Sequence, residues 1–195
     1  MNKNLKRAIQ GILFILIIAA FIFVGKKDFT KEIVVDNEKF DLEYSNVSSD
    51  NVFVYANAQD VYTRFKNGNA VVFMGFPTNK WSGYYAEMLN TVAKELGVKE
   101  ILYYDFKKDR ETKNAIYQSV VLKLSSYTYT NDNGTQNIYA PTMFIIKNGK
   151  VIHFDNETAI MKGNLSPEDY WNANNRAIQL NKFRLMFKDY LGIKE

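Results

Sequence analysis

The stretch from Ala70 to Leu96 restricts the possible folds more than any other part of the chain. It begins with a continuous apolar run, Ala70–Met74, which is typical of a strand that is buried on both faces of a sheet. A Gly-Phe-Pro turn breaks this run, and apolar side chains at helical spacing follow from Lys80 to Leu96. We therefore expect a central strand, a tight turn and an amphipathic helix within an α/β domain.

The flanking segments alternate between strand and helix patterns. Strands are expected over 52–55, 70–74, 100–104, 139–146 and 150–154, and helices over 58–66, 80–96, 111–124 and 166–191. Asn57 and Asp109 are predicted helix caps, Gly97 and Gly192 are predicted helix ends, and residues 125–137 are predicted to form a loop or small hairpin. Asn-Gly at 148–149 is a strong two-residue hairpin signal. This order predicts a mixed sheet with helices on both faces.

The first 31 residues have the pattern of a membrane anchor or signal segment. Three basic residues precede an apolar run over residues 8–24, and two lysines follow it. The run is close to the roughly 17–25 residues that span a bilayer. A cleaved signal peptide is the alternative, but residues 21–25 offer no small-x-small cleavage site. We expect an uncleaved single-pass anchor in the cell membrane, with the globular part outside the cytoplasm, although the basic residues flanking the run are nearly balanced.

Residues 32–50 are interpreted as an arm and linker before a globular domain over 51–195. Residues 33–35 suggest a short strand, and the alternation of Phe40, Leu42 and Tyr44 suggests a small hairpin or an extended arm. A polar linker is expected from Ser45 to Asn51.

The composition excludes several kinds of chemistry. The chain has no cysteine, so disulfides, thiolate catalysis and thiolate metal sites are excluded, and its one histidine, His153, removes most imidazole-based schemes. We expect no metal and no cofactor. The net charge is +4, but basic and acidic residues are mixed, as in residues 107–111, which are interpreted as solvated surface. A nucleic-acid partner is disfavoured because no basic block occurs.

Two local sequences carry a resemblance to a known family. One is Val-Val-Phe-Met-Gly-Phe-Pro-Thr-Asn-Lys-Trp-Ser over residues 71–82, and the other is Ala-Pro-Thr over 140–142, followed by Lys-Asn-Gly-Lys over 147–150. With the order of elements, they resemble the thioredoxin-like superfamily over roughly residues 52–154. These local sequences are most similar to those of membrane-anchored proteins of Gram-positive bacteria, of the bacteriocin transport accessory type.

The resemblance assigns positions but not the family's reaction. Asn79, Lys80, Trp81 and Ser82 occupy the Cys-x-x-Cys positions, and Pro141 corresponds to the family's cis-proline. Thiol–disulfide exchange needs a thiolate that attacks a sulfur, which an amide and a hydroxyl cannot replace. The favoured interpretation is that Asn79 caps the helix by accepting from the backbone N–H of Trp81 or Ser82.

The same positions predict a peptide groove. The residues expected to line it are Pro77, Thr78, Trp81, Ala140, Pro141 and Thr142. Trp81 is expected to be exposed at the helix start and to serve as a binding anchor. The alternative is that Trp81 packs on a neighbouring loop. A catalytic pair of Ser82 with His153 is disfavoured.

These observations favour a binding protein over an enzyme. We expect a redox-inactive, membrane-anchored, extracytoplasmic thioredoxin-like protein with a binding or accessory role in secretion or at the cell surface, and with a protein or peptide partner at the groove. A diverged or Cys-substituted thiol–disulfide oxidoreductase is the alternative, and a purely structural domain is the third possibility.

Overall fold

A computed structural model describes residues 37–131, 134–157 and 165–194. The anchor predicted over residues 8–24 and the strand predicted over 33–35 lie outside the described residues. Within the described ranges, no helix has both the length and the hydropathy that crossing a membrane requires.

The centre of the fold is a five-stranded mixed sheet, as predicted. Its strands are β1 (Phe53–Tyr55), β2 (Ala70–Gly75), β3 (Ile101–Asp105), β6 (Thr142–Lys147) and β7 (Lys150–Asn156). They are arranged in the order β1-β3-β2-β6-β7, with β1, β3 and β2 parallel and with β6 and β7 antiparallel to their neighbours. Every residue of β2 is buried, which confirms that the run Ala70–Met74 is a central strand.

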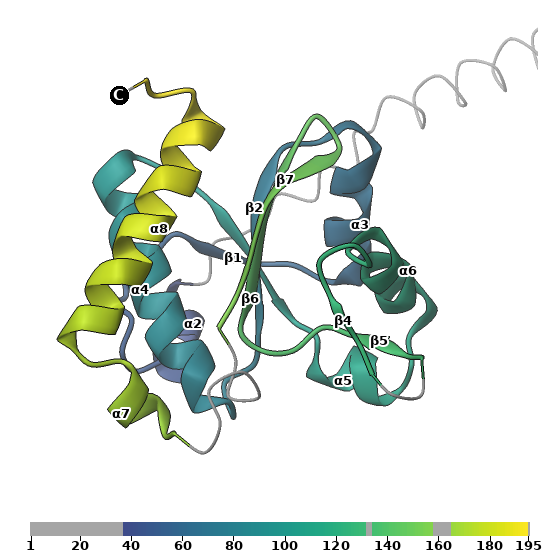
Figure 1. The fold of residues 1–195 in the computed structure, drawn as a ribbon, viewed down its shortest axis with the longest axis horizontal. Helices are drawn as coiled ribbons and strands as arrows, with labels where there is room; N and C mark the ends of the chain where they lie inside the picture. Colours follow the sequence, from purple (N-terminus) through teal and green to yellow (C-terminus); the bar gives the residue numbers. More distant parts are fainter. Residues whose placement is uncertain (1–36, 132–133, 158–164, 195) are drawn as a thin grey trace, which may run out of the picture. The chain divides into compact units, whose positions relative to one another are not determined.

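Helices cover both faces of this sheet (Figure 1). On one side lie α3 (Ala58–Asn67), α5 (Lys107–Glu111) and α6 (Ala115–Lys123), together with a small hairpin of β4 (Tyr129–Thr130) and β5 (Gln136–Asn137). On the other side lie α2 (Asn37–Glu43), α4 (Lys80–Leu96), α7 (Pro167–Tyr170) and α8 (Ala173–Leu191). The hairpin within residues 125–137 is confirmed.

Several predicted helix ends and turns are confirmed by their local geometry. The Asn57 side chain accepts from the backbone of Gln59 and Asp60, which forms a capping box at the start of α3. Gly97 and Gly192 end α4 and α8 in the left-handed conformation, which glycine adopts without a steric penalty.

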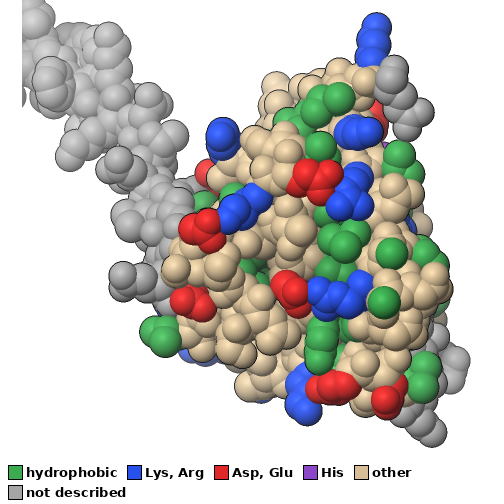
Figure 2. All heavy atoms as spheres, turned by 90° about the vertical axis from the view of Figure 1, so that its left-hand side faces the viewer, with side chains coloured by type: hydrophobic (Ala, Val, Ile, Leu, Met, Phe, Trp, Pro, Cys, Tyr) green, Lys and Arg blue, Asp and Glu red, His purple; other side chains and the backbone are tan. Residues whose placement is uncertain are grey.

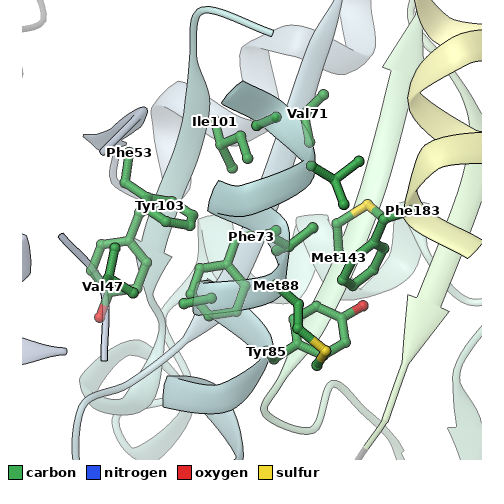
Figure 3. Close-up of a cluster of buried hydrophobic side chains, with 14 of the residues drawn as sticks. Val47, Phe53, Val71, Phe73, Tyr85, Met88, Ile101, Tyr103, Met143 and Phe183 are labelled. Carbon is green, nitrogen blue, oxygen red and sulfur yellow. The ribbon is translucent and has the colours of Figure 1, made fainter. Parts of the chain in front are cut away.

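The core on the α4 side of the sheet is rich in aromatic rings and methionine. Figure 3 shows Phe73 of β2 and Met143 of β6 near Tyr85 and Met88 of α4, with Phe183 of α8 beside them. All five residues are at most 1% exposed. Phe73 and Tyr85 stack with ring centroids 6.0 Å apart, so α4 is packed directly on the central strand.

Ion pairs on the outer surface hold α8 against α4. Arg176 lies 2.6 Å from the Glu87 carboxylate, and Arg184 lies 2.8 Å from that of Glu95. Figure 2 shows this face of the molecule, where acidic and basic side chains lie next to one another with hydrophobic side chains between them. Because the charges are paired, this surface has no single dominant sign.

The prediction of a small hairpin or extended arm over Phe40 to Tyr44 is wrong, because Phe40 and Leu42 lie in helix α2 and Tyr44 directly follows it, with its backbone N–H donating to the Phe40 carbonyl oxygen. Phe40 and Tyr44 are buried and stack with ring centroids 4.6 Å apart, whereas Leu42 is 86% exposed. A spacing of four residues returns to the same face of a helix, so Phe40 and Tyr44 can share a face in a helix as well as in a strand. The exposure of Leu42 distinguishes the two.

Two predicted long helices are each divided. Asn114, rather than Asp109, caps α6, since its side chain accepts from the backbone of Ile116 and Tyr117. Asp109 lies inside α5, where its carboxylate accepts from the Tyr104 hydroxyl at 2.5 Å. The C-terminal helix is likewise interrupted between α7 and α8, because Asn172 starts a new cap. In both cases an Asn side chain competes for backbone donors inside the predicted helix.

Candidate functional site

The site predicted from the sequence lies where β2 leads into α4. Asn79 is the N-cap of α4, as predicted, and its Oδ1 accepts from the Ser82 backbone N–H at 3.1 Å. Its Nδ2 donates to the Ala140 carbonyl oxygen at 3.4 Å. One side chain therefore satisfies one backbone donor of the helix start and also connects this start to the segment before β6.

Ser82 faces inward and is fully buried. Its Oγ lies 3.5 Å from the Asn79 Oδ1, which is a weak contact. A Cβ at Gly75 would lie 3.0 Å from this hydroxyl and 2.8 Å from the Phe73 ring, so the close approach of α4 to β2 requires glycine there. Sequence reasoning did not identify this role of Gly75, although the glycine at the end of an apolar run was its signal.

The second predicted segment lies beside the first. The Ala140–Pro141 peptide bond is cis. Thr142 is fully buried, with its hydroxyl donating to the Tyr139 carbonyl oxygen at 2.6 Å and accepting from the Asn156 amide at 2.8 Å. Ala140 and Pro141 are buried as well.

Only some of the residues predicted to line a groove are accessible to solvent. Thr78 is exposed and Pro77 is half-buried, whereas Trp81 and residues 140–142 are buried. Access to this site is therefore through Pro77, Thr78 and Asn79 and the surface next to them.

The prediction that Trp81 is exposed is wrong. Trp81 is 5% exposed, and its ring lies 5.2 Å from that of Tyr170 and 6.2 Å from that of Trp171. The short helix α7 and its end cover the first turn of α4 and remove the indole from solvent. Trp81 is therefore a core residue, and it packs on α7 and its end rather than on a neighbouring loop.

Lys80 remains on the surface and forms an ion pair with α7. Its Nζ lies 3.4 Å from the Glu168 carboxylate. The pKa of Glu168 lies below its usual value, chiefly because of its own backbone N–H and further because of Lys80. This exposed pair adds to the contact between α7 and the start of α4.

A cluster of aromatic and cationic groups adjoins Thr78. The Arg110 guanidinium lies 5.5 Å from the ring centroid of Phe76 and 5.4 Å from that of Phe106. The Lys107 Nζ lies 5.8 Å from the Phe76 ring and 3.4 Å from the Thr78 hydroxyl, to which it donates. The sequence missed this cluster because the alternating charges of residues 107–111 indicated only a solvated surface.

The two residues of the disfavoured catalytic pair have separate partners. The His153 Nε2 lies 2.7 Å from the Asp189 carboxylate on α8. The Ser82 hydroxyl meets Asn79 and is not within hydrogen-bond distance of an imidazole in the described part of the chain. Within these residues, no group of three or more His, Asp or Glu side chains is placed to hold a metal ion.

A buried carboxylate lies between the sheet and the two helices of the α4 side. Asp155 of β7 is 3% exposed and accepts from the Tyr85 hydroxyl at 2.5 Å and the Gln179 amide at 2.6 Å. It also pairs with Lys182 of α8. Burial raises the pKa of Tyr85 well above its usual value, and Asp155 adds to this effect, so Tyr85 stays a hydrogen-bond donor. The network fixes α8 and α4 to β7.

No protein-family model matches the chain, and no curated protein matches it either.

Taken together, the helix start and its surroundings combine buried polar groups with a small accessible surface. One backbone N–H of the helix start donates to the Asn79 side chain, and the serine that carries it is buried. The accessible groups are an exposed threonine, a half-buried proline and the cationic cluster on Phe76.

Proposed function

We propose that this protein is a redox-inert, thioredoxin-like binding protein, anchored in the cell membrane through residues 8–24, with its globular domain outside the cytoplasm. Its role is to bind an extended protein segment, as an accessory to secretion or to a cell-surface process. The binding surface consists of Pro77, Thr78 and Asn79, beside the segment at Ala140.

One observation carries this proposal. The helix start and the Ala140 segment are joined by the Asn79 amide, yet neither carries a thiol. The mixed sheet with helices on both faces supports the thioredoxin-like assignment. The apolar run over residues 8–24 supports the anchor, since its length approaches that of the bilayer core.

A diverged or Cys-substituted oxidoreductase is the second candidate. It is favoured by the position of the Asn79 and Ser82 side chains, whose oxygens lie 3.5 Å apart. The two side chains therefore point toward each other, as a pair of bonded cysteines at these positions would have to.

A double substitution tests the placement of the loop. Asn79→Cys with Ser82→Cys should form an intramolecular disulfide, seen as a loss of two thiols that a reductant restores. The matched control is Thr91→Cys with Lys94→Cys, which has the same spacing further along α4 and should stay reduced. If the pair at 79 and 82 stays reduced, or forms a disulfide no more readily than the control pair, the alignment with Cys-x-x-Cys is refuted.

Site-specific crosslinking in native membranes tests the binding function. A photoreactive residue at Thr78 should yield a discrete crosslinked partner, identified by mass spectrometry. The same residue at Thr112, an exposed position on the loop after α5, serves as the control. Equal products from both positions, or none at Thr78, would refute a binding role for this surface.

A further inference from the structure

The aromatic and cationic cluster beside Thr78 has a composition that suits a particular ligand. It consists of Phe76, Phe106, Lys107 and Arg110. The Phe76 and Phe106 rings lie 5.6 Å apart and edge to face, and the Arg110 guanidinium lies over both. Contact with aromatic faces favours a cation and reduces its freedom, so Arg110 is held in place before any ligand arrives.

Both cations of the cluster lack an acidic partner in the part of the chain that the structure describes. Among the described residues, no carboxylate lies within 4.0 Å of the Lys107 Nζ or of the Arg110 guanidinium. Two of the three acids nearest in sequence are engaged elsewhere, since Asp109 accepts from the Tyr104 hydroxyl and Asp105 accepts from the Lys107 backbone N–H. The third, Glu111, is exposed and forms no ion pair with either cation. This contrasts with Lys80, Arg176 and Arg184, which all have carboxylate partners.

The cluster faces the proposed binding surface. Lys107 and Arg110 are three residues apart on α5, a spacing that places them on the same side of a helix. Lys107 donates to the Thr78 hydroxyl, and the next residue, Asn79, donates to the Ala140 carbonyl. A side chain of a segment lying along Thr78 and Asn79 would therefore come next to these cations.

The charge of this region matches a single anionic group. Residues 105–113 contain four Lys or Arg and three Asp or Glu residues. A nucleic acid or another polyanion needs a larger excess of positive charge on one face. A carboxylate, in contrast, pairs with the planar fork of one arginine and gains a second charge-assisted hydrogen bond from a neighbouring lysine.

We propose that Lys107 and Arg110 form a subsite for a carboxylate side chain, so that the protein binds acidic peptide segments. This inference rests on the proposed function, because it specifies the chemistry of the segment bound at Thr78 and Asn79. Phe76 forms the apolar base of the subsite, and Thr78 connects it to the binding surface.

Peptide selection on the full-length protein in nanodiscs tests the subsite. A displayed library of random linear peptides is the probe, and empty nanodiscs remove background binders. We expect enriched peptides with Asp or Glu at one fixed position. Their affinity should fall at least tenfold for Arg110→Glu and for Lys107→Glu, and increasing salt should weaken it as well.

Lys108→Glu is the matched control, because it makes the same charge change on the same helix at an exposed side chain. Its affinity should stay within about threefold of the wild type, which is the modest effect of an exposed rim charge. Arg110→Gln is the second variant for the case in which the charge reversal disturbs packing on Phe106, and circular dichroism verifies the folded state of each variant.

The outcomes separate the two proposals. Enriched peptides without an acidic position, or an equal loss of affinity in Lys108→Glu and Arg110→Glu, would overturn the carboxylate subsite and leave the binding function intact. Failure to enrich any peptide, together with no partner crosslinked through Thr78, would overturn the binding function itself.

Discussion

Replacement of Trp81 by alanine tests whether this residue is core or surface. The indole is 5% exposed and packs from the first turn of α4 against the rings of Tyr170 and Trp171. A buried tryptophan removes about 200 Å² from water, which at about 25 cal/mol per Å² corresponds to an upper estimate of about 5 kcal/mol. Alanine retains part of that area and leaves a cavity, so we expect a loss of about 3–5 kcal/mol.

The assay is urea unfolding of the full-length protein in detergent, followed by far-ultraviolet circular dichroism. The free energy of unfolding should fall while the dependence on urea stays the same, since a cavity changes stability without changing the surface that unfolding exposes. Trp81→Phe keeps most of the ring contacts and should lose clearly less. This second variant remains measurable if the alanine variant does not fold.

Leu42→Ala is the matched control for a large apolar side chain outside the core. Leu42 is 86% exposed on α2, and its removal should change stability by no more than about 0.5 kcal/mol. A loss of less than about 1 kcal/mol in Trp81→Ala would refute the burial argument, because an exposed tryptophan behaves in that way.

Three further predictions follow from the same structure. Asp155→Ala leaves a buried hydroxyl and a buried amide without their acceptor, so urea titration should show a loss of about 3–5 kcal/mol. Asp155→Asn keeps one acceptor oxygen, and a loss as large as that of alanine would contradict this role. Gly149→Ala places a Cβ 2.9 Å from the Phe65 carbonyl oxygen, whereas Gly97 has nearly the same φ with open space around it. Gly97→Ala should therefore cost only the left-handed backbone penalty of about 1–2 kcal/mol, and Gly149→Ala should cost more; equal midpoints in urea would speak against the steric argument. Burial raises the pKa of Tyr117 to about 12, and burial likewise raises the pKa of Tyr85. The unfolded chain releases these protons near pH 10, so stability is complete below about pH 10 and decreases as the pH rises toward about 12. Urea titrations below about pH 10 and near about pH 12 measure the decrease in the free energy of unfolding. A free energy of unfolding that does not change over this pH range would exclude the raised pKa values.

The predicted sheet was correct because its signals are local. The continuous apolar run of β2, the Asn-Gly turn before β7 and the glycines after α4 and α8 each specify a structure within a few residues. Asn57 and Asn79 were also predicted correctly as caps, since the geometry of a helix start needs only the neighbouring backbone donors.

The errors arose where two patterns agree over a short span. Phe40 and Tyr44 share a face in both a helix and a strand, and only the exposure of Leu42 shows that α2 is helical. Asn114 and Asn172 interrupt helices whose apolar spacing continues across them. The spacing of the apolar side chains does not show whether a polar side chain within the pattern caps a helix or lies inside one.

The sequence alone excluded thiol chemistry and indicated where the chain turns. Without cysteine, no thiol reaction is open to the strand–turn–helix junction, and this follows from composition alone. Its N-cap was equally determined, because a cap is a contact within four residues.

Only the tertiary structure decided which side chains of the junction meet solvent. Trp81 is covered by residues about ninety positions later in the chain, and Arg110 gains its place on Phe76 through a different helix. Burial depends on every element packed around a side chain, so contacts between distant segments cannot be derived from the spacing of one segment.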